Sequence, residues 1–311
     1  MIHSTHRIDM SGLHGLYPFV SHFIELDGLR YHYLDEGQGE PVVMVHGNPT
    51  WSFYFRNLVH RLSADFRTIV PDHIGCGLSD KPTEAQYDFR LSTRIRDLER
   101  LIDSLALNEP ITLILHDWGG AIGIGYALRH PQRIARIVVM NTAAFLPPNG
   151  KKLPLRLEIV RRLGTLSRIA VLGGNLFCRT ALVMAPRKRL HRSVRKGLCA
   201  PYNSWNNRLA TLKFVEDIPL TSSDPSFPLI QWMDHHIHRL APIPMMILWG
   251  MHDFVFDADY LAEWQRRFPT ARVHRYPEAG HYLLADEPES TGINILNFLK
   301  STGSCCNVPY L

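Results

Sequence analysis

Asp117 stands where a side chain could act as a nucleophile. It directly follows the apolar run Leu113–His116, and Trp118–Gly120 opens a helix-forming stretch behind it. This layout predicts a nucleophile elbow, a tight strand-to-helix turn that lifts one side chain out over a sheet, and the amino end of the helix favours negative charge beside it. Leu115 departs from the pattern, because the residue two before the nucleophile is normally small. The alternative interpretation of Asp117 is a structural aspartate in a turn.

A second candidate element is the loop that follows the apolar run ending at Val45. Its Gly47 would let a backbone N–H point at the elbow, where it would join the N–H after Asp117 in an oxyanion hole. Asn48 adds a side-chain amide donor, and Trp118 adds an indole N–H. Two neutral donors beside a carboxylate suit an anionic leaving group. Taken alone, the loop is equally compatible with a plain structural turn.

Two further polar side chains follow predicted strands nearer the carboxyl end of the chain. Asp253 ends the sequence Gly-Met-His-Asp, and His281 stands in the sequence Ala-Gly-His-Tyr. With Asp117 they give the chain order nucleophile, acid, base that is typical of hydrolases with an elbow. His281 would activate a water molecule, while Asp253 would orient and polarise its imidazole. Asp257 is the alternative acid.

These residues need a sheet to bring them together. Short β-branched runs alternate with stretches of helical period, which is the signature of a mostly parallel sheet with helices on both faces. The expected strands are Tyr31–Asp35, Pro41–Val45, Thr68–Pro71, Ile111–His116, Ile134–Asn141, Met245–Trp249 and Val273–Tyr276. The expected helices are Leu91–Leu107, Ala121–Arg129 and Glu287–Leu299.

Residues 145–227 break this alternation, since they are helix-rich, basic and punctuated by Pro and Gly. We interpret them as a helical cap inserted into a core formed by residues 1–144 and 228–300, roofing a pocket at the carboxyl ends of the strands. Residues 301–311 would form a C-terminal tail, in which the pair Cys305 and Cys306 has no evident role.

The bulk composition is that of an ordinary globular protein. Of the 311 residues 45% are hydrophobic and 20% charged, so the chain can bury a substantial core. Its five cysteines include no CxxC pair, which favours reduced thiols over a disulfide framework. No signal-peptide pattern and no apolar run near the ~18 residues of a membrane span is visible. We therefore expect a cytoplasmic location, and no cofactor or metal because no phosphate loop or ligand spacing is present.

Charge is distributed unevenly along the chain. The segment from Lys151 to Lys213 contains fifteen Lys and Arg against one acid, Glu158, whereas the rest holds 19 bases and 28 acids. Nucleic acid is a poor explanation, because no binding motif accompanies these charges. The segment is either a set of solvated helix faces or a docking surface for another copy of the protein or a membrane. The mixture of Arg and aliphatic residues between Leu155 and Arg168 is compatible with an amphipathic helix.

Beyond these local patterns, the sequence resembles the haloalkane dehalogenases of the α/β-hydrolase fold over roughly residues 17–298. The resemblance implies that Asp117 displaces a halide ion from an sp³ carbon, and that Asn48 and Trp118 hold the departing halide. The matching motifs are His46–Trp51, Pro71–His73 with Ser79–Pro82, His116–Gly120 and Gly280–His281.

The position of the predicted acid indicates which subfamily of haloalkane dehalogenases the sequence resembles. The stretch that begins at Asn141 offers no carboxylate, whereas Asp253 follows the next strand, as in the third dehalogenase subfamily. That subfamily is similar to the β-lactone decarboxylases of bacterial olefin synthesis. Residues 200–208 and 217–220 look particularly like the cap of those enzymes. Because both groups share their site residues, these residues do not separate them.

Our first prediction from the resemblance is a haloalkane dehalogenase. Asp117 would form an ester with a small halogenated or lipid-like substrate, and water activated by His281 would release an alcohol. The alternative is a β-lactone decarboxylase, which gives an olefin and carbon dioxide. An epoxide hydrolase would want two cap tyrosines, and residues 145–227 hold Tyr202 alone. A non-catalytic binding protein on the same fold is the remaining alternative.

Overall fold

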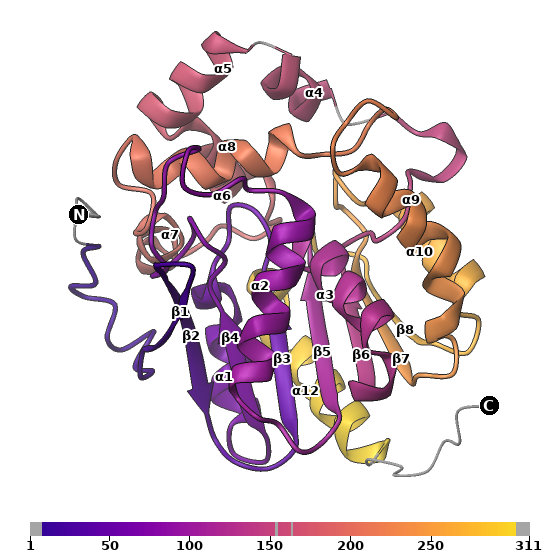
Figure 1. Ribbon diagram of the computed structural model, residues 1–311. Helices are drawn as coiled ribbons and strands as arrows, with labels where there is room; N and C mark the ends of the chain where they lie inside the picture. The colour runs from indigo at the N-terminus through magenta and orange to yellow at the C-terminus, as the bar shows by residue number, and fades with distance from the viewer. Residues whose placement is uncertain (1–7, 153–154, 163, 303–311) are drawn as a thin grey trace.

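One sheet of eight strands runs through the protein (Figure 1). The computed structural model describes residues 8–152, 155–162 and 164–302. Across the sheet the strands are β1 (His22–Leu26), β2 (Leu29–Glu36), β4 (Arg67–Pro71), β3 (Pro41–Val45), β5 (Ile111–His116), β6 (Ile134–Met140), β7 (Met245–Gly250) and β8 (Arg272–Tyr276). β2 is antiparallel to both β1 and β4, and the remaining pairs are parallel. The predicted mostly parallel sheet is confirmed, with β1 as an additional edge strand.

Two hydrophobic cores cover the two faces of this sheet. Along β3, Val43 and Val45 belong to one core while Val42 and Met44 belong to the other, as the two-residue period of a strand requires. The first core is closed by α2 (Leu91–Ser104), α3 (Trp118–Arg129), α9 (Phe227–His236) and α10 (Ala258–Arg267). The second is closed by α1 (Arg56–Leu62), α11 (Leu283–Asp286) and α12 (Pro288–Ser301).

Most of the chain between β6 and β7 lies over the carboxyl ends of the strands (Figure 1). Its helices are α4 (Leu155–Arg162), α5 (Thr165–Arg168), the π-helix Ile169–Gly173, α6 (Leu176–Met184), α7 (Arg192–Cys199) and α8 (Leu209–Glu216). Short 3-10 helices occupy Ser52–Phe55, Pro131–Arg133, Pro148–Gly150, Asn206–Arg208 and Ile237–Leu240. We call residues 145–227 the cap from here on.

The last helix, α12, includes the first residue of the predicted C-terminal tail. α12 extends to Ser301, and the pair Cys305 and Cys306 lies outside the described residues. In the part of the chain that the structure describes, no single helix is long and apolar enough to cross a membrane. The segments Thr165–Gly173 and Leu176–Met184 reach that length and composition only as a pair bent by 73°.

Candidate active site

The turn after β5 holds Asp117 in a strained backbone conformation. Its φ of 52° and ψ of −128° lie where residues with a side chain are rarely found. The Asp117 carbonyl accepts hydrogen bonds from the N–H of Gly120 at 2.9 Å and from the hydroxyl of Thr142. A Cβ on Gly119 would lie 1.9 Å from the carbonyl oxygen of Val45, so the turn requires glycine there. The structure thus places Asp117 at a tight strand-to-helix turn.

Leu115 is accommodated by a glycine inside α3. The Leu115 side chain is fully buried, and a Cβ on Gly123 would lie 2.2 Å from its Cδ2 atom. Because Gly123 has no side chain, the large Leu115 side chain fits at a position where hydrolases of this kind normally have a small residue. The departure from the elbow pattern leaves the turn itself intact.

The carboxylate of Asp117 is buried and held from two sides. Its Oδ1 accepts the backbone N–H of Asn48 at 2.6 Å, and its Oδ2 lies 3.5 Å from Nε2 of His281. Burial alone would raise the pKa of Asp117, but the hydrogen bond and charge of His281 and the Asn48 N–H hold it below its ordinary value. Asp117 is therefore ionised at neutral pH, the form that a nucleophile needs.

His281 lies between two carboxylates. Its Nδ1 is 2.7 Å from Oδ2 of Asp253, whose other oxygen accepts the N–H of Val255 at 2.7 Å. Asp257, the alternative acid, is instead paired with Lys151 and caps α10. The structure thus brings Asp117, His281 and Asp253 into one row and leaves Asp257 outside it.

We expect His281 to be an imidazolium at neutral pH. Burial alone would lower its pKa, but Asp253 and Asp117 raise it to about 10. Since this value lies above the ordinary 6.5, the stability that the proton contributes is complete below about pH 6.5 and is lost as pH rises through about 10. In an NMR titration the ring N–H signals of His281 should persist well into the alkaline range. Asp253→Asn should shift that titration towards neutral pH, and an unchanged titration would contradict the assigned partner.

The cap helix α8 supports both predicted leaving-group donors. The side-chain Nδ2 of Asn48 donates to the carbonyl of Thr211 at 2.9 Å, which leaves the second N–H of this amide for another acceptor. The Trp118 ring packs against Phe214, with 5.4 Å between ring centroids. Asn48 and Trp118 both line the cavity beside Asp117.

That cavity measures about 430 Å³ and separates Asp117 from the cap. The polar groups of Asn48, Asp117, Trp118 and His281 meet in it, and most other lining side chains are apolar. The cap contributes Ile159, Leu166, Leu176, Phe177, Val215 and Leu220, and the core contributes Phe254, Val255, Phe256 and Tyr260. Such a cavity suits a hydrophobic substrate with one polar, reactive centre.

Two buried side chains, to which the sequence analysis assigned no positioning role, hold the loops of the site in place. Nε2 of His116 lies 2.8 Å from the carbonyl oxygen of His281 and holds that backbone against the elbow. The amide of Asn141 donates to the carbonyl of Gly250 at 3.0 Å and accepts its N–H at 2.8 Å, which ties the end of β6 to the end of β7. The absence of a carboxylate at Asn141 thus reflects a structural role.

Arg94 is a residue that the sequence analysis did not single out. It is buried, forms no ion pair with a residue that the structure describes, and lies 3.6 Å from the ring centre of Phe214. Because Phe214 packs on Trp118, this buried cation supports the wall behind a predicted donor. Arg94 belongs to an amphipathic helix, in which an arginine is normally expected to face water.

Residues 40–288 match the family described as "alpha/beta hydrolase fold". The chain belongs to the α/β-hydrolase fold family. Among solved structures, a haloalkane dehalogenase from Agrobacterium tumefaciens superimposes on this α/β-hydrolase with a TM-score of 0.80, over 91% of this chain and 97% of that chain, at 22% identity. The predicted fold class is confirmed.

Relatives of this α/β-hydrolase carry both of the predicted activities in their names. A cis-3-alkyl-4-alkyloxetan-2-one decarboxylase from Shewanella oneidensis is 49% identical over 92% of this chain and 90% of its own. Haloalkane dehalogenase 2 from Mycobacterium bovis is 28% identical over 90% of this chain and 95% of its own. An oxetan-2-one is a β-lactone, so the more similar relative matches our alternative. The comparison therefore favours the β-lactone decarboxylase over the dehalogenase that we predicted first.

Proposed function

We propose that this α/β-hydrolase decarboxylates β-lactones that carry one alkyl chain on each of two neighbouring ring carbons. The products would be an alkene and carbon dioxide. The observation that carries the proposal is the 49% identity to a cis-3-alkyl-4-alkyloxetan-2-one decarboxylase over 92% of the chain, against 28% identity to a dehalogenase. An ionised Asp117 facing an apolar cavity supports it.

Asp117 is the nucleophile in this proposal. Its carboxylate attacks the ring carbon that bears the ring oxygen, and the carbon–oxygen bond breaks, which opens the strained ring and leaves a carboxylate on the neighbouring carbon. The bond to that carboxylate then breaks and carbon dioxide departs. The released electron pair forms the carbon–carbon double bond while the bond to Asp117 breaks. Asp117 returns as a carboxylate, and no water is consumed.

The surrounding groups stabilise charge where it develops. Asn48 and Trp118 would donate to the ring oxygen as it becomes a carboxylate oxygen, in the place that a departing halide would take in a dehalogenase. The imidazolium of His281, 3.5 Å from Oδ2 of Asp117, would stabilise the charge that returns to Asp117 at the end. Asp253 would keep His281 protonated and oriented.

The rival activities make different demands on the same cavity. A dehalogenase needs His281 to lose its proton and activate water, whereas the decarboxylation above uses its positive charge. An epoxide hydrolase needs cap tyrosines at the substrate. Tyr202 is buried, donates to the carbonyl of Thr50 at 3.3 Å and is not part of the cavity lining. The position of Tyr202 therefore argues against the epoxide reaction.

The direct test is turnover of a cis-dialkyl β-lactone labelled at its carbonyl carbon. We expect a cis-alkene in gas chromatography and an equal amount of labelled carbon dioxide. Brominated alkanes should be assayed in parallel for halide release. Halide release without alkene formation would return the assignment to the dehalogenase, and a β-hydroxy acid would reveal a lactone hydrolase. Binding of the lactone without any product would support the non-catalytic alternative.

A further inference from the structure

The cavity reaches the outer surface of the cap. Leu166 and Leu176 line the cavity, yet the exposed fraction of Leu166 is 65% and that of Leu176 is 52%. Ile159, a third lining residue, is also exposed. Side chains that line a cavity and contact solvent mark the place where the cavity opens. These three residues place an apolar opening of the cavity, its mouth, at α4, α5 and α6.

The exposed face of α6 continues the apolar mouth. Leu176, Arg179, Thr180 and Val183 are exposed, and their spacing of three and four residues places them on one side of the helix. Val183 is 69% exposed and is not one of the residues that line the cavity. A helix on the surface of a globular protein normally turns its aliphatic side chains inward. This face of α6 instead presents them outward, with a cation between them.

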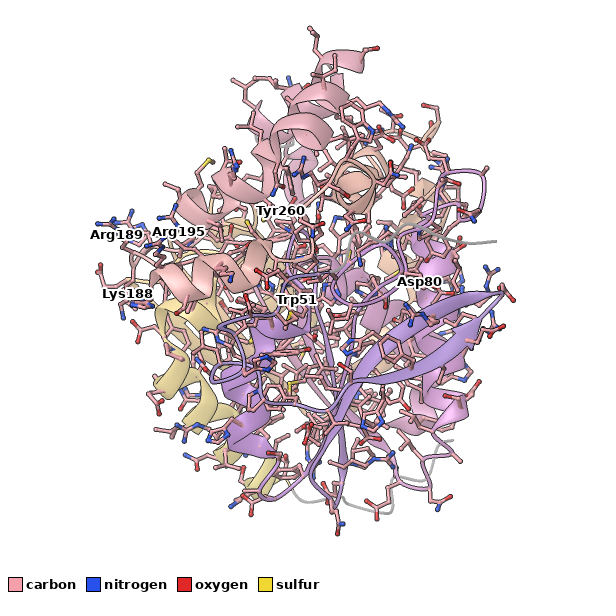
Figure 2. All side chains as sticks on the ribbon, turned by 90° about the vertical axis from the view of Figure 1, so that its left-hand side faces the viewer. Trp51, Asp80, Lys188, Arg189, Arg195 and Tyr260 are labelled. Carbon is pink, nitrogen blue, oxygen red and sulfur yellow. The ribbon has the colours of Figure 1, made fainter. Side chains whose placement is uncertain are left out.

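Cations dominate the chain that follows, from the end of α6 through α7. Between Arg179 and Lys196, both included, there are seven Lys and Arg and no Asp or Glu. Figure 2 shows Lys188, Arg189 and Arg195 projecting away from the body of the protein. A basic stretch free of acidic residues thus runs through α7, a helix that packs against α6.

Several of these cations have no acidic partner among the residues that the structure describes. Arg189, Arg192 and Arg195 are exposed and form no ion pair with any residue in the described ranges. Arg161 and Arg168, in the stretch that the sequence marked as amphipathic, are both paired with acids. Exposed arginines that remain available to an external anion thus lie on α7 and in the loop before it.

We propose that the cap docks on an anionic lipid bilayer through a surface formed by Leu166, Leu176, Val183, Arg189, Arg192 and Arg195. The aliphatic side chains enter the acyl region while the arginines contact lipid phosphates, as in amphipathic elements that lie in a membrane interface. The mouth of the cavity then opens towards the acyl chains. In a step that rests on the proposed function, a dialkyl lactone dissolved in the bilayer enters the cavity without crossing water.

A second copy of the chain is the competing occupant, because the rest of the chain is acidic. A protein seated on this surface would cover the mouth of the cavity and exclude substrate. A bilayer instead supplies apolar molecules at that mouth, and its anionic headgroups complement the unpaired arginines. The coincidence of mouth, aliphatic side chains and unpaired cations therefore favours lipid.

The test is co-sedimentation of the full chain with vesicles, which requires no enzymatic activity. We expect binding to vesicles that contain phosphatidylglycerol, weak binding to phosphatidylcholine alone, and a steep loss with added salt. The double variant Arg192→Glu/Arg195→Glu should weaken binding by at least about tenfold. The matched control is Arg239→Glu/Arg275→Glu, which changes the net charge equally at two exposed positions of the core and should bind like the wild type. Val183→Gln should also weaken binding.

Each contrary outcome overturns the docking proposal. Equal binding to both kinds of vesicle, or equal loss in the cap and control variants, would show that this surface is not the contact. Salt-sensitive self-association that the cap variant abolishes, without vesicle binding, would identify a second copy as the partner. Thermal unfolding of each variant excludes misfolding as the cause of a loss. Failure of lactone turnover alongside normal vesicle binding would overturn the proposed function and leave the docking surface standing.

Discussion

Replacing Asp117 with asparagine is expected to abolish alkene release from a cis-dialkyl β-lactone. The amide keeps the size of the side chain and its contact with the Asn48 N–H, but it removes the attacking carboxylate oxygen. Loss of a nucleophile typically costs on the order of 10⁴-fold or more in kcat. Initial rates of alkene formation, measured at saturating lactone, check the prediction.

The chain offers a closely matched control for this variant. Asp257→Asn makes the same chemical change in a side chain that is paired with Lys151 rather than with His281. We expect its alkene release to stay near that of the wild type, because Asp257 does not line the cavity. Asp117→Asn protein that retains most of its activity would exclude covalent catalysis by this residue. If Asp257→Asn were as inactive as Asp117→Asn, the acid that supports His281 would be Asp257 and its assignment to Asp253 would be wrong.

Turnover of the β-lactone in water enriched in heavy oxygen is expected to leave the Asp117 carboxylate unlabelled. In the proposed elimination the carbon–oxygen bond to Asp117 breaks and the same two oxygens return. In a dehalogenase-type reaction, water attacks the carbonyl carbon of the aspartyl ester, so repeated turnovers place solvent oxygen in the side chain. Mass spectrometry of the peptide that contains Asp117 distinguishes the two routes completely.

The labelling experiment needs a positive control, and a haloalkane dehalogenase turned over in the same water supplies it. Label in Asp117 after lactone turnover would mean that water attacks an ester at this residue. The elimination would then be wrong even if alkene were among the products. Because no water attacks Asp117 in the proposed elimination, the expected result is an unlabelled carboxylate.

The side chains of the site were predictable because each follows an apolar strand. Asp117, Asp253 and His281 stand directly after strands or in the loops beyond them, and parallel strands bring such positions to one edge of a sheet. The choice of Asp253 over Asp257 also follows from position, since Asp253 is nearer to the end of β7. Their partnership with one another is geometry that only the fold supplies.

The supporting contacts were not predictable in the same way. The bond from Asn48 to Thr211 joins residues that are 163 positions apart, and its acceptor is a backbone carbonyl that any residue could provide. β1 was missed for a different reason. Only alternate residues of this edge strand face the protein and its exposed fraction is high, so His22–Leu26 lacks the continuous apolar run of a central strand. The ion pairs of the cap depend on tertiary packing, so the sequence did not show which cations stay unpaired.

The side chains that line the cavity and the side chains proposed to react come from different parts of the chain. Most of the lining comes from one continuous stretch between β6 and β7, whereas Asp117, Asp253 and His281 come from loops outside that stretch. We therefore expect this stretch to determine mainly the substrate range, although its helix α8 also supports the donors Asn48 and Trp118. Insertions, deletions or recombination in the cap outside α8 would change which substrates are accepted while the reacting groups keep their positions. For the same reason, grafting the cap of a relative while keeping α8 is a direct route to new substrate ranges.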